Sequence, residues 1–332
     1  MNLQIEKPAI VLKAQEKQKG MNLFLEILVF VAVLVVAAIA QVLCTIPIEL
    51  LILSQNAAYN AAVAAGDLER ATAAAVEIAA SDMYTALSLI STIGMTAVAI
   101  AFCRFIQKRK LTMIGFTKQR AGKDYLIGLV MGFLLFSVSV LICVLTGALK
   151  INGVSSTFSI GIFALFIVGF MLQGMSEEVL CRGYLMVSIG RRYSMWVAIL
   201  SNSLIFAALH LLNDGISVLA LINLVLYGVF ASLYFIERGS IWGVAAFHSV
   251  WNLVQGNFWG LRVSGIVTEC SVFQSTIADN RNIINGGDFG PEGGLAVTIV
   301  LAVGICALLK RIQSVGHSSA YAEGSAVMEE GN

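Results

Sequence analysis

The sequence predicts an all-α protein, a polytopic bundle of membrane-spanning helices. Hydrophobic residues make up 58% of the 332-residue chain and charged residues 12%, with a mean hydropathy of +0.86, whereas about a quarter of the residues in soluble domains are charged. Apolar runs of about 20 residues recur along the chain, and each is long enough to cross a hydrocarbon core of about 30 Å. The chain has three prolines, few enough for long helices. These observations exclude a water-soluble globular domain.

About eight spans are predicted from these apolar runs, and they cover residues 22–45, 83–106, 125–148, 158–188, 195–212, 216–236, 240–259 and 295–311. Lysines precede the first span, and a cluster of Lys and Arg follows the second. Basic loops stay on the cytoplasmic side of a membrane. We therefore expect both termini to be cytoplasmic and the chain to be a multi-pass protein of the cell membrane.

The domain organisation follows from these spans. Residues 1–21 are expected to form a cytoplasmic N-terminal tail, residues 22–312 a transmembrane domain, and residues 313–332 a disordered cytoplasmic tail of mostly small and polar residues. The alanine-rich segment 55–82 has the composition of an external helix. The glycine-rich stretch 261–294 is predicted to be a long outside loop.

Charge and cysteine content exclude several classes of function. The net charge is +1, so the chain has no overall basic field that would attract nucleic acid. Its apolar composition makes membrane lipids its expected surroundings. The six cysteines show neither a CxxC motif nor a Cys/His ligand spacing. They therefore indicate neither a disulfide framework nor a zinc cage.

Polar side chains inside three of the predicted spans require an explanation, because an ionisable residue in hydrocarbon costs about 2.5–3.5 kcal/mol on insertion scales. They are Glu177, Glu178 and Arg182 in the fourth span, His210 in the fifth, and His248 and Asn252 in the seventh. Counting the helical rise from the basic end of each span places Glu177, His210 and His248 in the middle or outer part of the bilayer. One shared site is therefore predicted.

Spacing along the helices assigns roles to these residues. Glu178 and Arg182 are separated by four positions, which favours a buried ion pair with a structural role. Glu177 points to a different helical face and lacks such a partner, so it is a candidate general base. His248 and Asn252 are also four positions apart and can present two donors to a developing oxyanion. His210 on its own is explained equally well as a hydrogen-bonding group between helices.

Three motifs in order carry a resemblance to a known family. They are Glu-Glu-x-x-x-Arg from Glu177 to Arg182, Phe-x-x-x-His from Phe206 to His210, and His-x-x-x-Asn from His248 to Asn252. Together they resemble the CPBP family of CAAX-prenyl proteases and bacteriocin-processing intramembrane proteases, also called the Abi family, and in particular its type II CAAX prenyl endopeptidases. The resemblance covers residues 158–260, the motif core of the transmembrane protease domain that it implies over 22–312.

The resemblance implies a glutamate-dependent intramembrane endopeptidase that cleaves a membrane-associated or lipid-modified peptide or protein. Glu177 and His210 would position and deprotonate the attacking water, while His248 and Asn252 would stabilise the oxyanion. Glu178 and Arg182 would hold the helix and the glutamate in place. From its position one turn before His210, Phe206 is expected to be a packing residue that walls the site.

Two matters stay open at this point. Members of the family are often called metalloproteases, and a bound zinc would use Glu177, His210 and His248; the chain has no HExxH motif, and we expect no tightly bound metal. Other functions are a proton-coupled transporter, a catalytically inactive membrane scaffold or a bacteriocin self-immunity protein. A transporter is disfavoured because we find no internal repeat and because the ionisable groups cluster within 177–252.

Overall fold

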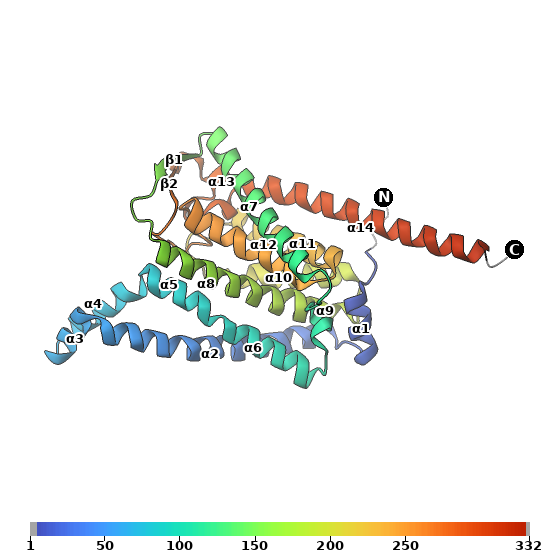
Figure 1. Cartoon of the computed structure of the whole chain (residues 1–332), viewed down its shortest axis with the longest axis horizontal. Coiled ribbons are helices and arrows are strands. Elements are labelled where there is room, and N and C mark those ends of the chain that lie inside the picture. The colour runs from blue at the N-terminus through green and yellow to red at the C-terminus, as the bar shows by residue number, and fades with distance from the viewer. Residues whose placement is uncertain (1–4, 330–332) are drawn as a thin grey trace.

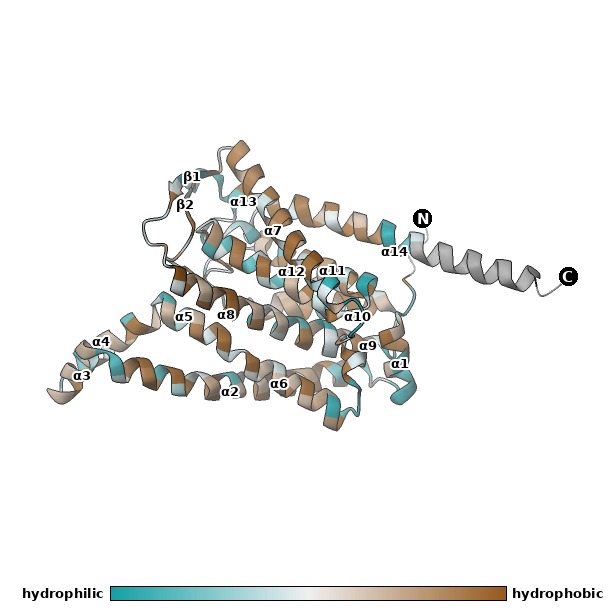
Figure 2. Cartoon of the chain, viewed as in Figure 1, coloured by the Kyte–Doolittle hydropathy of each residue, from teal (hydrophilic) through white to brown (hydrophobic). Residues whose placement is uncertain are grey.

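The computed structural model describes residues 5–329, and the side chains as far as residue 314. It is a bundle of helices that run roughly alongside one another (Figure 1), with apolar residues along most of their length (Figure 2). Six helices of the described chain are long and apolar enough to cross a membrane: Leu23–Gln55, Asp82–Ile106, Ala121–Leu145, Ile160–Gly190, Val218–Arg238 and Leu295–Ser314. The predicted all-α polytopic fold is confirmed.

The other two of the eight predicted spans are shorter or more polar than predicted. Residues 195–212 form α10 (Met195–Ala208), which has 14 residues. Residues 240–259 form α12 (Ile241–Leu253) and the π-helical turn η4 (Val254–Phe258). Nearly all of α12 is buried, and it packs against α7, α8 and α11. Because α12 contacts protein instead of lipid, it can carry polar side chains.

The first part of the chain forms α1 (Ala9–Lys17), α2 (Leu23–Gln55), α3 (Ala57–Ala64), α4 (Leu68–Ala79), α5 (Asp82–Ser91), α6 (Ile93–Ala101), the π-helical turn η1 (Phe102–Ile106) and the 3-10 turn η2 (Leu111–Ile114). The predicted tail 1–21 contains α1, where Val11 and Ala14 are fully buried; its first four residues lie outside the described chain. The external helix predicted over 55–82 is two helices, α3 and α4. Gly66 interrupts it with a φ of 69°, a left-handed value that favours glycine.

The second part of the bundle holds the motif core. It contains α7 (Ala121–Leu145), α8 (Ile160–Glu178), the π-helical segment η3 (Val179–Met186), α9 (Val187–Gly190), α10, α11 (Val218–Arg238), α12 and α14 (Leu295–Glu329). Glycines let α12 approach both neighbours: a Cβ on Gly174 of α8 would lie 2.7 Å from the Ser249 nitrogen, and one on Gly132 of α7 would lie 2.6 Å from the Phe247 oxygen. This close packing fixes the position of α8 relative to α12.

The predicted outside loop 261–294 is more ordered than its composition indicated. It contains β2 (Phe273–Ile277), the 3-10 turns η5 (Asp279–Arg281), η6 (Gly287–Phe289) and η7 (Pro291–Gly293), and α13 (Asn282–Asn285). Strand β2 pairs antiparallel with β1 (Leu149–Val154), with Leu149 opposite Ile277. The side-chain amide of Asn285 donates to the Ala148 and Ala278 carbonyl oxygens at 2.8 and 2.9 Å. The loop is thereby fastened to the end of α7.

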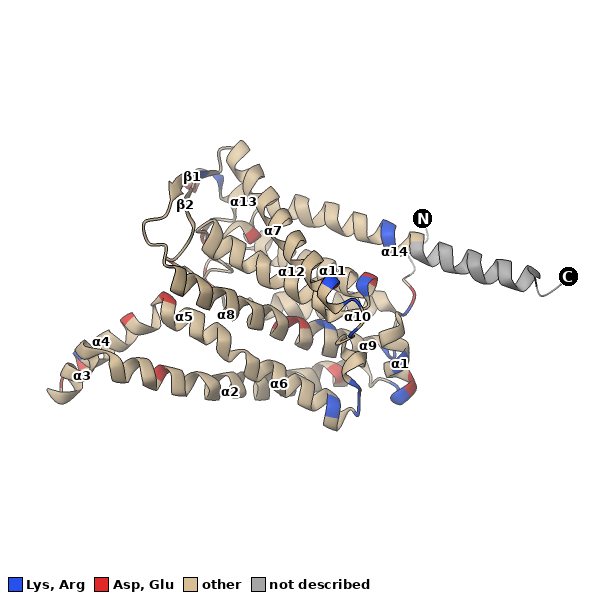
Figure 3. Ribbon diagram, in the orientation of Figure 1, with Lys and Arg blue, Asp and Glu red and all other residues tan. Residues whose placement is uncertain are grey.

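Charge distinguishes the two ends of the bundle (Figure 3). We call the end with α1, η2 and α9 the basic end; it carries Lys7, Lys13, Lys17, Lys19, Arg104, Lys108, Arg109, Lys110, Lys118, Arg120, Lys123, Arg191, Arg192, Arg238, Lys310 and Arg311. The opposite end carries α3, α4 and the two strands (Figure 1). In the tail predicted over 313–332, the described backbone continues α14 as far as Glu329. Its disorder stays a prediction, and residues 330–332 and the side chains beyond 314 lie outside the described part.

Candidate active site

One cavity, with a volume of about 690 Å³ including its mouth, brings the predicted residues together. Its lining includes Glu177 from α8, Phe206 and His210 from the end of α10, and His248 and Asn252 from α12. Glu178 and Arg182 do not line it and lie behind its wall, fully buried. The structure therefore brings five of the seven predicted residues to one cavity and places the other two behind its wall.

Glu177 presents its carboxylate to this cavity. It lies in the last turn of α8, just before the π-helical segment η3, and its side chain is 28% exposed. The amide of Gln173 donates a hydrogen bond to Oε1, and the His248 Nε2 atom lies 3.7 Å from Oε2. π-Helical segments of this kind occur frequently at functional sites. The Glu177 carboxylate is thus held from two sides while part of it stays accessible.

Glu178 links an arginine and a histidine inside the protein. Its Oε1 accepts from the Arg182 Nη1 at 2.9 Å, which is the ion pair predicted from their spacing, and from the His248 Nδ1 at 2.8 Å. The Arg182 guanidinium lies over the Phe206 ring, 4.7 Å from its centroid, in a cation–π contact. A carboxylate that accepts from Nδ1 fixes the orientation of an imidazole and favours its charged form. Glu178 therefore orients His248, a role that spacing alone did not indicate.

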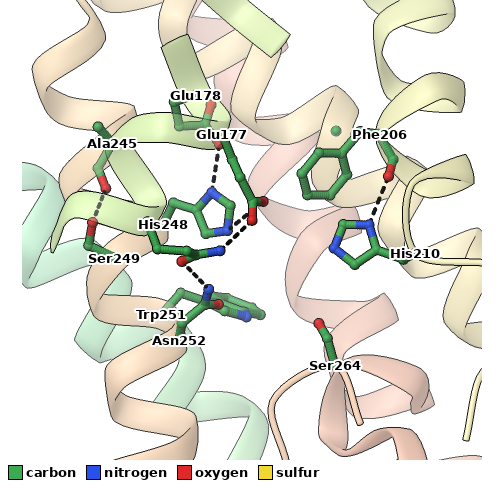
Figure 4. A network of polar contacts seen from close by, with 12 residues as sticks. Glu177, Glu178, Phe206, His210, Ala245, His248, Ser249, Trp251, Asn252 and Ser264 are labelled. Atoms are coloured by element: carbon green, nitrogen blue, oxygen red, sulfur yellow. Dashed lines mark hydrogen bonds and ion pairs between the residues drawn. The ribbon is translucent and has the colours of Figure 1, made fainter. Parts of the chain in front are cut away.

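His210 has a defined tautomer. It follows the end of α10, and its Nδ1 lies 2.8 Å from the Phe206 carbonyl oxygen. Because a carbonyl oxygen only accepts, Nδ1 carries a proton, and Nε2 of the neutral ring keeps a lone pair. Figure 4 shows His210 and His248 on opposite sides of the site with the Glu177 carboxylate between them. The two imidazoles thus differ: His248 is anchored to an acid and His210 to a backbone acceptor.

Asn252 is held by a residue that the sequence analysis missed. Its side-chain amide donates to the Gln173 Oε1 at 3.1 Å, while the Gln173 amide donates to Glu177. Gln173 therefore connects the Glu177 carboxylate with the Asn252 amide. It lies four positions before Glu177, on the same face of a helix, and this spacing is the signal that could have identified it.

A wall of the cavity comes from the loop 261–294, whose Glu292 was not predicted as a site residue. The Glu292 carboxylate accepts from the Trp251 Nε1 at 3.3 Å, and from the backbone nitrogen and Oγ of Ser264 at 3.0 and 2.7 Å. The Asn223 amide donates to the Glu292 carbonyl oxygen at 2.7 Å. These bonds fasten the loop to α11 and α12 beside the site.

The side chains do not fit a zinc site as they lie. No group of three His, Cys, Asp or Glu side chains in the described residues is arranged to hold a metal ion. Both imidazoles use Nδ1 in hydrogen bonds within the protein, so only Nε2 of each could bind a metal, as is usual for histidine ligands, and the Glu177 carboxylate is hydrogen-bonded to Gln173. The expectation of no tightly bound metal stays a prediction, and the reaction proposed below uses only the groups of the chain.

Comparison with known proteins gives one family. The sequence model described as type II CAAX prenyl endopeptidase Rce1-like matches residues 159–254, which contain all seven predicted site residues. No curated protein and no solved structure matches the chain.

The fold and the site define a multi-pass membrane protein with a polar cavity between its helices. The match over residues 159–254 confirms the predicted resemblance to the CPBP family and supports a CAAX-type intramembrane protease at the level of the family.

Proposed function

We propose that this protein is a glutamate-dependent intramembrane endopeptidase of the cell membrane. Its substrate is a membrane-associated or lipid-modified polypeptide, and its reaction is the attack of an activated water on a peptide carbonyl. The observation that carries the proposal is the position of the Glu177 carboxylate between two imidazoles of different hydrogen-bonding character in one cavity (Figure 4).

Glu177 and His210 are suited to activate the water. The Glu177 carboxylate is partly exposed to the cavity and has no arginine or lysine partner among the described residues, so it is free to accept a proton. The Nε2 lone pair of His210 can accept a hydrogen bond from the same water and orient it. As the water oxygen bonds to the carbonyl carbon, its proton passes to Glu177.

His248 and Asn252 are suited to stabilise the oxyanion that results. Glu178 accepts from the His248 Nδ1, so a proton on Nε2 is stabilised and directed toward the cavity. The Asn252 amide uses one N–H on Gln173, and its second N–H remains for a substrate oxygen. Preorganised donors of this kind are each worth about 100-fold to 1000-fold in rate. Glu177 then returns its proton to the leaving nitrogen, and the peptide bond breaks.

The test is cleavage of a pooled library of fluorogenic lipidated and unlipidated peptides by the detergent-purified protein. Glu177→Gln should abolish turnover and leave the unfolding temperature nearly unchanged, because glutamine can keep a bond to Gln173. Glu77→Gln, on the external helix α4, is the matched control and should retain full activity. Full activity of a triple variant of Glu177, His210 and His248 would refute the mechanism.

The same variants distinguish the other functions, with uptake measured after reconstitution into lipid vesicles. Cleavage that persists in a chelator supports the metal-independent reaction, whereas its loss in a chelator favours zinc. A transporter would change the pH dependence of substrate uptake in Glu177→Gln. A scaffold or self-immunity protein would keep its partner binding or its protection in that variant.

A further inference from the structure

A second hollow of the bundle lies between α7, α11 and α14. Its volume is about 1160 Å³ including its mouth, and we call it the α7–α14 groove. Gly304 lets α14 approach α11, since a Cβ there would lie 2.7 Å from the Phe230 ring. Helix α14 packs less extensively against α7 than against α11. The groove therefore lies along the side of α14 that faces α7.

Helix α14 separates this groove from the active-site cavity. Val297 and Leu301 line the cavity, whereas Ile299 and Val303 line the groove. Residues two positions apart on an α-helix point to nearly opposite faces. The described lining of the groove includes none of the seven predicted site residues. A ligand in the groove would therefore not touch the groups that are proposed to act on the substrate.

Most of the groove is apolar, and it runs along the helices. Its lining extends from Ile127 to Ile142 on α7 and from Ile299 to Arg311 on α14. At a rise of about 1.5 Å per residue these stretches are about 18–22 Å long. One leaflet is about half of a hydrocarbon core of about 30 Å, so an acyl chain fits along the groove. An empty groove would lose dispersion contacts with its lining.

Charge is confined to one end of the groove. Its charged lining residues are Glu237, Arg238 and Arg311, which lie at the basic end. The Arg311 Nε donates to the Glu237 Oε1 at 2.6 Å, and the Arg238 Nη1 lies 3.7 Å from the same oxygen. Arg238 also pairs with Asp124, which lies 3.6 Å from Arg120. Three guanidiniums thus face two carboxylates, and one positive charge is left over.

Two of these guanidiniums have donors to spare. The Arg311 side chain is 61% exposed and uses its Nε on Glu237, so its two Nη groups remain. The Arg238 side chain is 6% exposed, and its Nε is buried without a partner among the described residues. Arginine binds phosphate in bidentate fashion, and basic pockets between membrane helices bind anionic lipid headgroups. The end of the groove therefore has the donors and the charge that a phosphate requires.

We propose that the α7–α14 groove binds one anionic glycerophospholipid from the leaflet that borders the basic end. An acyl chain lies along α7 and α14, and the phosphate lies at Arg238 and Arg311. Both α7 and α11 pack against α12, so the lipid fastens the helices that support the catalytic core. A ligand that binds only the folded protein also stabilises it. The proposal is independent of the proposed function, since it requires no catalysis.

Native mass spectrometry of the detergent-purified protein tests the proposal. The protein is titrated with phosphatidylglycerol, or with phosphatidylcholine of the same acyl chains. Val303→Trp obstructs the groove at a position that is 65% exposed, and Val42→Trp, 58% exposed on α2, is its matched control. Arg311→Gln removes a headgroup contact, and Arg104→Gln, an exposed arginine of η1 at the same end, is its matched control.

The wild type should retain one phosphatidylglycerol at least fivefold more tightly than phosphatidylcholine. Val303→Trp should lose this lipid, and Val42→Trp should keep it. Arg311→Gln should weaken phosphatidylglycerol binding by about fivefold, the usual effect of one basic residue at an anionic surface, while Arg104→Gln should not.

Equal binding of the two lipids by the wild type would overturn the proposal. Equal binding by Val303→Trp and Val42→Trp, or by Arg311→Gln and Arg104→Gln, would also overturn it, because the lipid would then lie elsewhere. A wild-type dimer that binds no lipid and that Val303→Trp dissociates would identify the groove as an interface between two copies of the chain instead.

Discussion

Glu178 and His248, on two different helices, are joined by a 2.8 Å hydrogen bond from Nδ1 to Oε1 (Figure 4). The same oxygen accepts from Arg182, and all three side chains are buried. One carboxylate thus balances the charge of a buried guanidinium and orients an imidazole at the cavity. The two roles can be separated by mutation.

Glu178→Gln should lower both stability and turnover. It leaves Arg182 as an uncompensated buried charge, and breaking a buried ion pair costs about 3–5 kcal/mol. The double variant Glu178→Leu with Arg182→Leu should recover the unfolding temperature, because an apolar pair replaces the ionic one. Its turnover should stay about 100-fold low or worse, since His248 still lacks its acceptor. Recovery of turnover together with stability would show that Glu178 has no role in orienting His248.

Gln173→Met should lower kcat by about 100-fold with little change in KM, because small misplacements of reacting groups have effects of this size. The substitution removes the bond to Glu177 and the bond from Asn252, while the side chain keeps a similar volume. Ser139→Ala, which removes a buried hydroxyl that donates to the Leu135 carbonyl oxygen within α7, is the control and should leave kcat unchanged. An equal loss in both variants would indicate a general effect of lost packing.

Gly174→Ala should destabilise the protein by about 1–3 kcal/mol, the usual cost of overpacking. The added methyl would lie 2.7 Å from the Ser249 nitrogen and would separate α8 from α12, which carry Glu177 and His248. Gly161→Ala is the matched control in the same helix, because nothing lies within 4 Å of a Cβ there. Thermal unfolding of the two variants in one detergent measures the difference; equal unfolding temperatures would contradict the close approach.

Sequence reasoning identified the residues that are expensive to bury. A glutamate, an arginine or a histidine inside an apolar span costs free energy that has to be compensated, so Glu177, Arg182 and His248 stood out. Counting the helical rise placed Glu177, His210 and His248 in the middle or outer part of the bilayer, and the three line one cavity in the structure. The resemblance to a family added the order of the motifs, and the match over residues 159–254 agrees with it.

The features that were missed are those that helical periodicity does not report. Gln173 is neutral and resembles the amides that commonly join membrane helices, so nothing distinguished it before its partners were known. Glu292 lies in a glycine-rich loop, and composition does not say which loop residue folds back onto the bundle. Strand β1 has six residues, too few to stand out from the preceding span. Each of these depends on tertiary contacts.

The charge of Glu292 gives the last prediction. Its carboxylate is fastened by Trp251 and Ser264 at the cavity wall, so a substrate residue beside it meets a fixed negative charge. We compare kcat/KM for a peptide with Asp beside the scissile bond with kcat/KM for the matched Asn peptide. Glu292→Gln should raise this Asp-to-Asn ratio by about tenfold, because two charges a few ångströms apart near a protein surface interact by a few kcal/mol. Glu269→Gln, an exposed position of the same loop, should leave the ratio unchanged. If both variants give the same ratio as the wild type, Glu292 only anchors the loop and substrate charge is selected elsewhere.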